Sequence, residues 1–284
     1  MRLTRKAFLA TLLGAPFAGL AGLSYMHYLE PHWLEVTQRR VPLGKLRQPI
    51  RLLHLSDLHA SDVVSLDYIE RAIDLALEQN AQLACLTGDF ITWSLDDPTR
   101  YAAILRKLSA AMPTYACIGN HDGGKWAGGT LGYSHFGRVQ QMLTDAGVDF
   151  LFNEKRDIAI DGQTLTIAGL GDLWSGDAKP ETVLAPAESA ATATPPVIVL
   201  SHNPDTKTLL QPYQWDLTLC GHTHGGQLII PFFGVRPFLP VKDKHFAEGL
   251  HHWDGRHLHI TRGIGNLHGL RFNCRPEVSV LTLG

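Results

Sequence analysis

The chain has 284 residues, of which 45% are hydrophobic and 18% are charged, and its formal net charge is -2 at pH 7. This length and apolar content suffice for one large domain with a sizeable core. The near-neutral charge provides no basic footprint, which argues against a general nucleic-acid-binding protein.

The N-terminal residues 1–29 predict an export signal or a membrane anchor. Three basic residues, Arg2, Arg5 and Lys6, precede an uncharged stretch at 7–29, and a helical membrane span needs roughly 20 residues. The run TRKAFL at 4–9 resembles a twin-arginine export signal in which Lys6 replaces the second arginine. The charge asymmetry places the N-terminus inside and the remaining chain outside. A cleaved signal and a buried helix of a soluble protein are the alternatives.

Residues 30–49 are predicted to form a basic linker, and residues 50–284 a catalytic domain. Apolar runs in this domain alternate with helix-period patterns, which favours parallel strands joined through helices. The predicted helices share apolar residues three or four apart and lie at 66–78, 99–111 and 136–146. The Asp161-Gly162 pair between two alternating runs at 154–169 predicts a hairpin. Closing strands are expected at 257–261 and 278–283.

Side chains that can bind metal ions follow five apolar runs, at the point where each predicted strand ends. The clusters are Asp57-Leu58-His59, Gly88-Asp89, Gly119-Asn120-His121-Asp122, Ser201-His202 and Gly221-His222-Thr223-His224. A parallel sheet would collect all of them at the carboxyl ends of its strands, where open α/β sheets bind ligands. Two aspartates, one asparagine and four histidines are too many donors for one four-coordinate zinc. They suit two ions that share a carboxylate.

The charges of such a site also favour a phosphate ester. Two divalent ions carry four positive charges, which Asp57, Asp89, a bridging hydroxide and a phosphodiester monoanion would balance. This sum does not separate phosphomonoesters from phosphodiesters. The alternative, that these residues are polar strand ends satisfied by hydrogen bonds, suits one histidine better than seven residues at five strand ends.

This ordered five-cluster pattern resembles the calcineurin-like metallophosphoesterase superfamily over residues 50–284. The runs GHTHGGQ at 221–227 and TRGIG at 261–265 are similar to those of bacterial membrane-associated phosphodiesterases of the YaeI/YkuE type. The resemblance implies an α/β fold, a β-sandwich of two mixed sheets flanked by α-helices. It also implies two divalent ions, the first held by Asp57, His59, Asp89 and His224 and the second by Asp89, Asn120, His202 and His222.

The same resemblance implies catalytic roles for two residues beside the ligands. His121 would protonate the leaving oxygen or stabilise the transition state, Asp122 would orient its ring, and a hydroxide shared by the ions would attack phosphorus in line. Thr92 stands where many family members carry an aspartate, a departure that affects a contact behind the ligands. Mixed nitrogen and oxygen ligands admit Mn, Fe, Zn, Ni or Co.

The expected function is therefore a two-metal phosphodiesterase, monomeric, on the periplasmic or outer face of a bacterial cell membrane. Its substrate is expected to be a phosphodiester, and an exposed apolar loop predicted at 225–240 favours a lipid- or wall-linked one. Core packing would explain the same loop. The alternatives are a pyrophosphatase of a UDP-diacylglucosamine-type lipid A precursor, which needs its site at the cytoplasmic face, and a non-catalytic metal-binding scaffold.

Several other residues leave two interpretations open. The glycine-rich segment 123–137 is either a mobile lip over the site or an ordinary surface loop, and it carries Lys125 and His135 as candidate contacts to phosphate or leaving group. Arg262 either contacts phosphate or caps a strand. The four cysteines have no CxxC spacing and are predicted to be buried thiols; they are Cys85, Cys117, Cys220 and Cys274.

Overall fold

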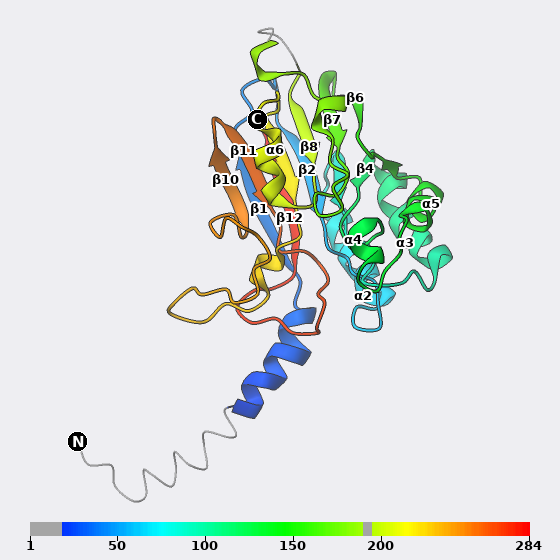
Figure 1. Cartoon of the computed structure of the whole chain (residues 1–284), viewed down its shortest axis with the longest axis vertical. Helices are drawn as coiled ribbons and strands as arrows, with labels where there is room; N and C mark the ends of the chain where they lie inside the picture. Colours follow the sequence, from blue (N-terminus) through cyan, green and yellow to red (C-terminus); the bar gives the residue numbers. More distant parts are fainter. Residues whose placement is uncertain (1–18, 190–194) are drawn as a thin grey trace, which may run out of the picture.

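Two six-stranded β-sheets stack face to face, with helices on the outer face of the first (Figure 1). The computed structural model describes residues 19–189 and 195–284. The strand order is β1-β12-β2-β3-β4-β5 in the first sheet and β10-β11-β9-β8-β7-β6 in the second. The expected α/β sandwich of two mixed sheets is confirmed.

The first sheet consists of four parallel strands and a pair of edge-side strands that run the opposite way. β12 lies between β1 and β2, parallel to β1 and antiparallel to β2. β2, β3, β4 and β5 are mutually parallel, so β1 and β12 both run opposite to them. The bounds are β1 Glu35–Val41, β2 Ile50–Leu55, β3 Leu83–Thr87, β4 Thr114–Cys117, β5 Asp149–Phe150 and β12 Glu277–Leu283.

The second sheet has a parallel centre and an antiparallel strand at each edge. β7, β8, β9 and β11 run parallel, whereas β6 and β10 pair antiparallel with their neighbours. The bounds are β6 Glu154–Ile160, β7 Gln163–Gly169, β8 Val197–Leu200, β9 Leu217–Cys220, β10 Gly249–Trp253 and β11 Arg256–Ile260. The turn between β6 and β7 is the predicted Asp161-Gly162 pair.

Three amphipathic helices cover the outer face of the first sheet: α2 (Leu66–Leu77), α3 (Pro98–Ala111) and α5 (Gly137–Asp145). The Ser65 hydroxyl accepts a hydrogen bond from the Tyr68 N–H at the start of α2, as an N-cap residue does. The remaining helices are short: α4 Lys125–Gly128, α6 Lys207–Leu210, η1 Tyr25–Leu29, η2 Glu30–His32, η3 Pro180–Thr182, η4 Ala187–Ser189, η5 Pro204–Thr206 and η6 His224–Gly226.

Apolar side chains fill the space between the sheets. Leu52 and Leu83 of the first sheet and Leu165, Ile198 and Leu217 of the second belong to one buried cluster. Burial of such surface is the main driving force for folding. The strands are therefore held rigidly, and the turns that follow them are fixed in space.

Two expectations about the architecture are wrong. Residues 35–41, predicted to belong to a linker, form β1 at the edge of the first sheet. The five polar clusters also do not follow the strands of one parallel sheet. Three follow β2, β3 and β4 of the first sheet, and two follow β8 and β9 of the second.

The N-terminal segment leaves the body of the domain as a helix (Figure 1). The described part is helical from residue 19 to residue 32. Residues 1–18, which carry most of the predicted signal or anchor, lie outside the described residues. Within the described ranges no helix is long and apolar enough to cross a membrane.

Candidate metal centre

The five polar clusters meet where the two sheets present the carboxyl ends of their strands. Two groups of three buried side chains each bring their nitrogen and oxygen atoms within 4.8 Å of one another. The first group is Asp57, His59 and His224, and the second is Asp89, His202 and His222. All seven residues expected to bind metal are buried, Asn120 included.

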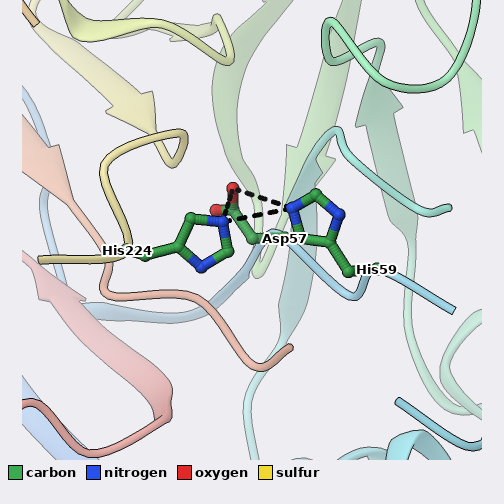
Figure 2. Close-up of side chains that lie close together, drawn as sticks. All are labelled: Asp57, His59 and His224. Atoms are coloured by element: carbon green, nitrogen blue, oxygen red, sulfur yellow. Dashed lines mark hydrogen bonds and ion pairs between the residues drawn. The ribbon is translucent and has the colours of Figure 1, made fainter. Parts of the chain in front are cut away.

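In the first group, side chains from both sheets point toward one another (Figure 2). Asp57 and His59 follow β2, whereas His224 begins η6 after β9. His224 Nε2 lies 3.4 Å from Asp57 Oδ1 and 3.1 Å from His59 Nε2. Three donors thus surround one point, as a metal ion requires.

The second group is connected to the first through Asp89. Its Oδ2 atom lies 3.0 Å from His202 Nε2 in its own group and 3.5 Å from His59 Nε2 in the other. His222 Nδ1 in turn lies 3.3 Å from His202 Nε2. A carboxylate so placed can contribute to two adjacent cations.

Asn120 supports the fit of this site to metal ions. Its Oδ1 atom is buried and has no hydrogen-bond partner among the described residues. An unsatisfied buried oxygen costs free energy unless a ligand compensates for it. Together with carboxylates and imidazoles, an amide oxygen completes a donor set suited to divalent transition metals. The residues present therefore fit two divalent ions.

The backbone is strained at most of the expected ligands. Asp57, His59, Asp89, His222 and His224 all have positive φ, between 48° and 69°. This left-handed conformation is uncommon for residues with a Cβ atom, and such strain concentrates at functional sites. Five of the seven expected ligands share it, so the turns after the strands aim these side chains at the cost of local strain.

Glycine is required where two of these turns approach each other. A Cβ atom at Gly221 would collide with Ser56 Oγ and Asp57 Oδ2, and one at Gly119 would collide with the Asp89 carboxylate. The Gly265 N–H also donates to the Asp57 carbonyl at 2.6 Å. The TRGIG run therefore supports the turn that carries Asp57.

Burial keeps three of the histidines neutral. It lowers the pKa of His59 and of His222 to about 3, and it lowers that of His224 well below the usual value. A neutral imidazole has a lone pair for a metal ion. For His202, burial also favours the neutral ring, but the Asp89 carboxylate outweighs it and raises the pKa to about 10.

The two carboxylates respond differently to their surroundings. Burial raises the pKa of Asp57 to about 6, although the nearby His202 ring lowers it. Burial also acts to raise the pKa of Asp89, but the His202 and His121 rings outweigh it and hold this pKa well below its usual value. Both groups are therefore mainly ionised at pH 7.

His121 and Asp122 lie beside the two groups, but they do not contact each other as expected. His121 Nδ1 lies 2.8 Å from the Thr92 carbonyl oxygen, which orients the ring. The Asp122 carboxylate instead accepts backbone N–H groups, from Asp89 and Gly119 at 2.8 Å and from Phe90 at 2.6 Å. The expectation that Asp122 orients the His121 ring is wrong, because both of its oxygens hold the turns after β3 and β4 together.

Thr92 retains contacts behind the ligands despite departing from the family pattern. Its Oγ1 lies 3.3 Å from His59 Nδ1 and so can position the ring.

Arg262 pairs with Glu277 at 2.9 Å and with Glu35 at 2.7 Å. These ion pairs tie the start of β12 to the start of β1, which agrees with the interpretation that Arg262 caps a strand.

Three tryptophans form an aromatic rim beside the site, and one of them, Trp126, comes from the glycine-rich segment 123–137. Trp126 contacts the His121 ring at 4.9 Å between centroids, and Trp93 contacts the same ring at 5.2 Å. Trp174 lies edge-on to His222 at 4.3 Å and contacts Trp126. Trp93 and Trp174 are partly exposed, so the rim faces solvent. Lys125 and His135 of the same segment are also exposed.

Asp172 is a candidate site residue that the sequence interpretation missed. It is 2% exposed, and one carboxylate oxygen accepts the Ser175 N–H at 2.6 Å while the other has no hydrogen-bond partner among the described residues. Burial raises its pKa, and the charges of His202 and Asp89 also act on it. The available signal was the Gly171-Asp172 pair one residue after β7, which resembles the Gly88-Asp89 pair after β3.

Comparisons with known proteins agree with this geometry. The family model described as calcineurin-like phosphoesterase matches residues 50–226. The chain is 40% identical to phosphodiesterase YaeI of Escherichia coli K12 over 99% of each chain. It is 31% identical to the uncharacterized metallophosphoesterase YkuE of Bacillus subtilis 168, over 99% of this chain and 98% of that protein.

A third relative has a more specific name. UDP-2,3-diacylglucosamine pyrophosphatase LpxG of Chlamydia trachomatis is 24% identical over 97% of this chain and 96% of its own. The catalytic residues expected from the resemblance lie inside or directly beside the two donor groups. The chain belongs to the calcineurin-like phosphoesterase family and is a hydrolase.

Proposed function

We propose that the chain is a two-metal phosphodiesterase that acts at the bacterial cell membrane. The observation that carries the two-metal proposal is the position of Asp89, whose Oδ2 lies within 3.5 Å of a histidine in each donor group. Asp57, His59, Asp89 and His224 would hold one divalent ion, and Asp89, Asn120, His202 and His222 the other. When bound, two such ions supply Lewis acidity and an activated water molecule.

His121 is proposed to deliver the proton to the leaving oxygen. A carbonyl oxygen can only accept, so the Thr92 carbonyl requires a proton on His121 Nδ1. This leaves Nε2 to face the substrate, where it would pass a proton to the leaving oxygen. The backbone N–H of His121 also donates to Asp89 Oδ1 at 2.9 Å, which holds this residue beside the proposed metal centre.

The aromatic rim is proposed to bind the organic part of the ester. Trp93, Trp126 and Trp174 contact His121 or His222, and Trp93 and Trp174 are partly exposed to solvent. Such faces limit the access of water beside the reacting group, which strengthens its electrostatic interactions. They also suit a diester, which carries a second organic substituent, better than a small monoester.

The membrane location is proposed from the N-terminal sequence, with the catalytic domain on the periplasmic or outer face. Basic residues at its start and the apolar stretch that follows have the pattern of an export signal or anchor. The relative named as a UDP-2,3-diacylglucosamine pyrophosphatase supports a second candidate, cleavage of a lipid-linked pyrophosphate. A topology reporter at the C-terminus separates the two, because a lipid A precursor requires a cytoplasmic site.

The test is hydrolysis by the full-length chain in detergent, stripped of metal and titrated with Mn²⁺. The substrates are bis-p-nitrophenyl phosphate, p-nitrophenyl phosphate and UDP-2,3-diacylglucosamine, and the control is Asp89→Ala. Mn²⁺-dependent cleavage of the diester well above the monoester, lost in the control, is expected. A monoester preference would overturn the substrate class, and cleavage of the pyrophosphate alone would favour the second candidate. Two bound ions without hydrolysis of any substrate would indicate a scaffold.

A further inference from the structure

Next to the metal centre lies an exposed aromatic loop, residues 228–238. Phe232 is 103% exposed and Phe233 80%, and Ile230, Val235 and Phe238 are also exposed. Five exposed apolar side chains in one short loop exceed the scattered apolar residues that are normal on a soluble surface. The predicted apolar loop is thus exposed and does not pack into the core.

Two backbone hydrogen bonds close the aromatic loop into a turn. The Ile230 N–H donates to the Val235 carbonyl at 2.9 Å, and the Gly234 N–H donates to the Ile230 carbonyl at 3.0 Å. These bonds close a turn with Phe232 at its tip, at a φ of 67°. A bulky residue rarely adopts this conformation, so the turn displays Phe232 at a conformational cost.

The base of the loop is tied to the metal centre. The loop follows η6, which begins with His224. The Arg236 guanidinium donates to the Gly225 carbonyl and pairs with Glu248. A surface engaged by the aromatic loop is therefore held beside one of the expected metal ligands.

The N-terminal helix emerges on the same side as the aromatic loop (Figure 1). Phe272 joins them: its N–H donates to the Gln227 carbonyl, its carbonyl accepts the Ile229 N–H, and its ring contacts Tyr25 at 6.4 Å. Along the helix Leu20, Leu23 and Leu29 are exposed. The uncharged stretch that begins at residue 7 leads into this helix.

The segments on this side of the molecule contain few acidic residues. Segments 19–34, 227–242 and 264–276 together contain one acidic residue, Glu30, which is buried and accepts the Cys274 N–H. Their basic residues include Lys242, which is exposed, and Arg236 and Arg275, which are half-buried. Glu248 pairs with Arg236 and Glu35 lies 3.9 Å from Arg275, so Lys242 and the exposed aromatic and aliphatic side chains are the features typical of surfaces that insert into the bilayer interface.

We propose that the aromatic loop inserts into the bilayer and presents the metal centre to a lipid phosphodiester. The proposal of insertion depends only on the exposed residues of the loop, whereas the proposed substrate class rests on the proposed phosphodiesterase function. In the reaction, water adds to phosphorus and the P–O bond to the headgroup breaks. The headgroup leaves with the proton, and a phosphatidate remains in the bilayer.

The insertion is tested without catalysis, on the full-length chain in vesicles of phosphatidylethanolamine and phosphatidylglycerol. All four native cysteines are buried, so Phe232→Cys provides one exposed thiol for an environment-sensitive fluorophore. The matched control is Leu131→Cys, because Leu131 is 80% exposed on the segment 123–137. Acyl-brominated lipids should quench the label at 232 and leave the label at 131 unaffected.

If protein or water, and not lipid, surrounds the aromatic loop, the labels give different results and the proposal is overturned. A label at 232 that is blue-shifted but not quenched by brominated lipid is covered by protein, from a second copy or from the N-terminal segment. A label that is neither shifted nor quenched faces water. Equal quenching at 232 and 131 would mean that the loop is not the site of insertion.

The substrate class is tested with two esters that share one leaving group. Phosphatidyl-p-nitrophenol in vesicles is compared with soluble bis-p-nitrophenyl phosphate, and the readout is the ratio of the two rates. The double variant Phe232→Ser/Phe233→Ser should lower this ratio about tenfold, whereas Leu131→Ser should preserve it. An unchanged ratio in the double variant overturns the lipid substrate. Failure of the phosphodiesterase proposal looks different, because both esters then remain uncleaved while the quenching persists.

Discussion

His59 and His224 direct their Nε2 atoms at each other across 3.1 Å, with ring planes 28° apart. Burial lowers the pKa of both rings, so both are neutral at pH 7. Two neutral imidazoles that meet through nitrogen require a shared proton or a cation between them, because their lone pairs repel. With Asp57 Oδ1 at 3.4 Å from His224, the arrangement favours a cation.

Metal content should distinguish ligands of one ion from the ligand shared by both. We expect about two ions per chain in the unmodified protein and about one in His224→Ala. Asp89→Ala should retain well below one, because its carboxylate lies between the two groups. Metal analysis by mass spectrometry of dialysed protein gives the count, with the exposed Asp62→Ala as control. Full retention in Asp89→Ala would contradict the shared carboxylate.

The effect of replacing His121 on turnover should depend on the leaving group of the ester. His121→Ala should keep its metal ions and slow the cleavage of an alkyl phosphodiester by roughly 10²–10⁴, as general acid catalysis typically contributes. For bis-p-nitrophenyl phosphate the loss should be much smaller, because p-nitrophenolate leaves without a proton. The measurement is kcat for both esters. Equal losses, or loss of the ions, would remove His121 from this role.

Asp122 is expected to act through the backbone of the site. In Asp122→Asn an amide NH₂ would face backbone N–H donors, which should lower the free energy of unfolding by about 1–3 kcal/mol. The pH dependence of the remaining turnover should be unchanged, because the Thr92 carbonyl still holds the His121 ring. Denaturant unfolding and a pH–rate profile test this, with exposed Asp145→Asn as control. A displaced profile at unchanged stability would restore a direct role.

Metal binding should release a proton near neutral pH. Burial opposes a charge on His202, but the Asp89 carboxylate outweighs it and raises the pKa to about 10, so the metal-free ring is protonated at pH 7. An ion must displace this proton, and its affinity should increase about tenfold per pH unit between pH 7 and 10. Calorimetric titration in buffers of different ionisation enthalpy counts the proton. Heats that do not depend on the buffer would contradict the prediction.

The strands and the polar clusters could be predicted from the sequence because both leave local patterns. β2, β3, β8 and β9 each lie on one of the apolar runs that end at a polar cluster, where strands were predicted. β1 was missed because an exposed edge strand needs no apolar run, and its middle is polar and basic. The pairing of the strands could not be predicted either, because periodicity does not indicate which strands share a sheet.

Within the site, residue types were easier to predict than contacts. The spacing of aspartates and histidines indicated which residues carry metal chemistry, and the structure brings them together. The partner of the His121 ring is a backbone carbonyl, that of Thr92, and carbonyls have no signature in a sequence. Asp122 follows His121 directly, yet its side chain reaches the neighbouring turn.

The order of the strands sets a condition on biosynthesis. β12, which follows every other described strand in the chain, is inserted between β1 and β2, which precede all the others. Until β12 has left the ribosome, these two strands have a gap between them. Contacts between such distant parts of a chain also form slowly. The nascent protein is therefore expected to acquire its ions only after β12 has been made and inserted.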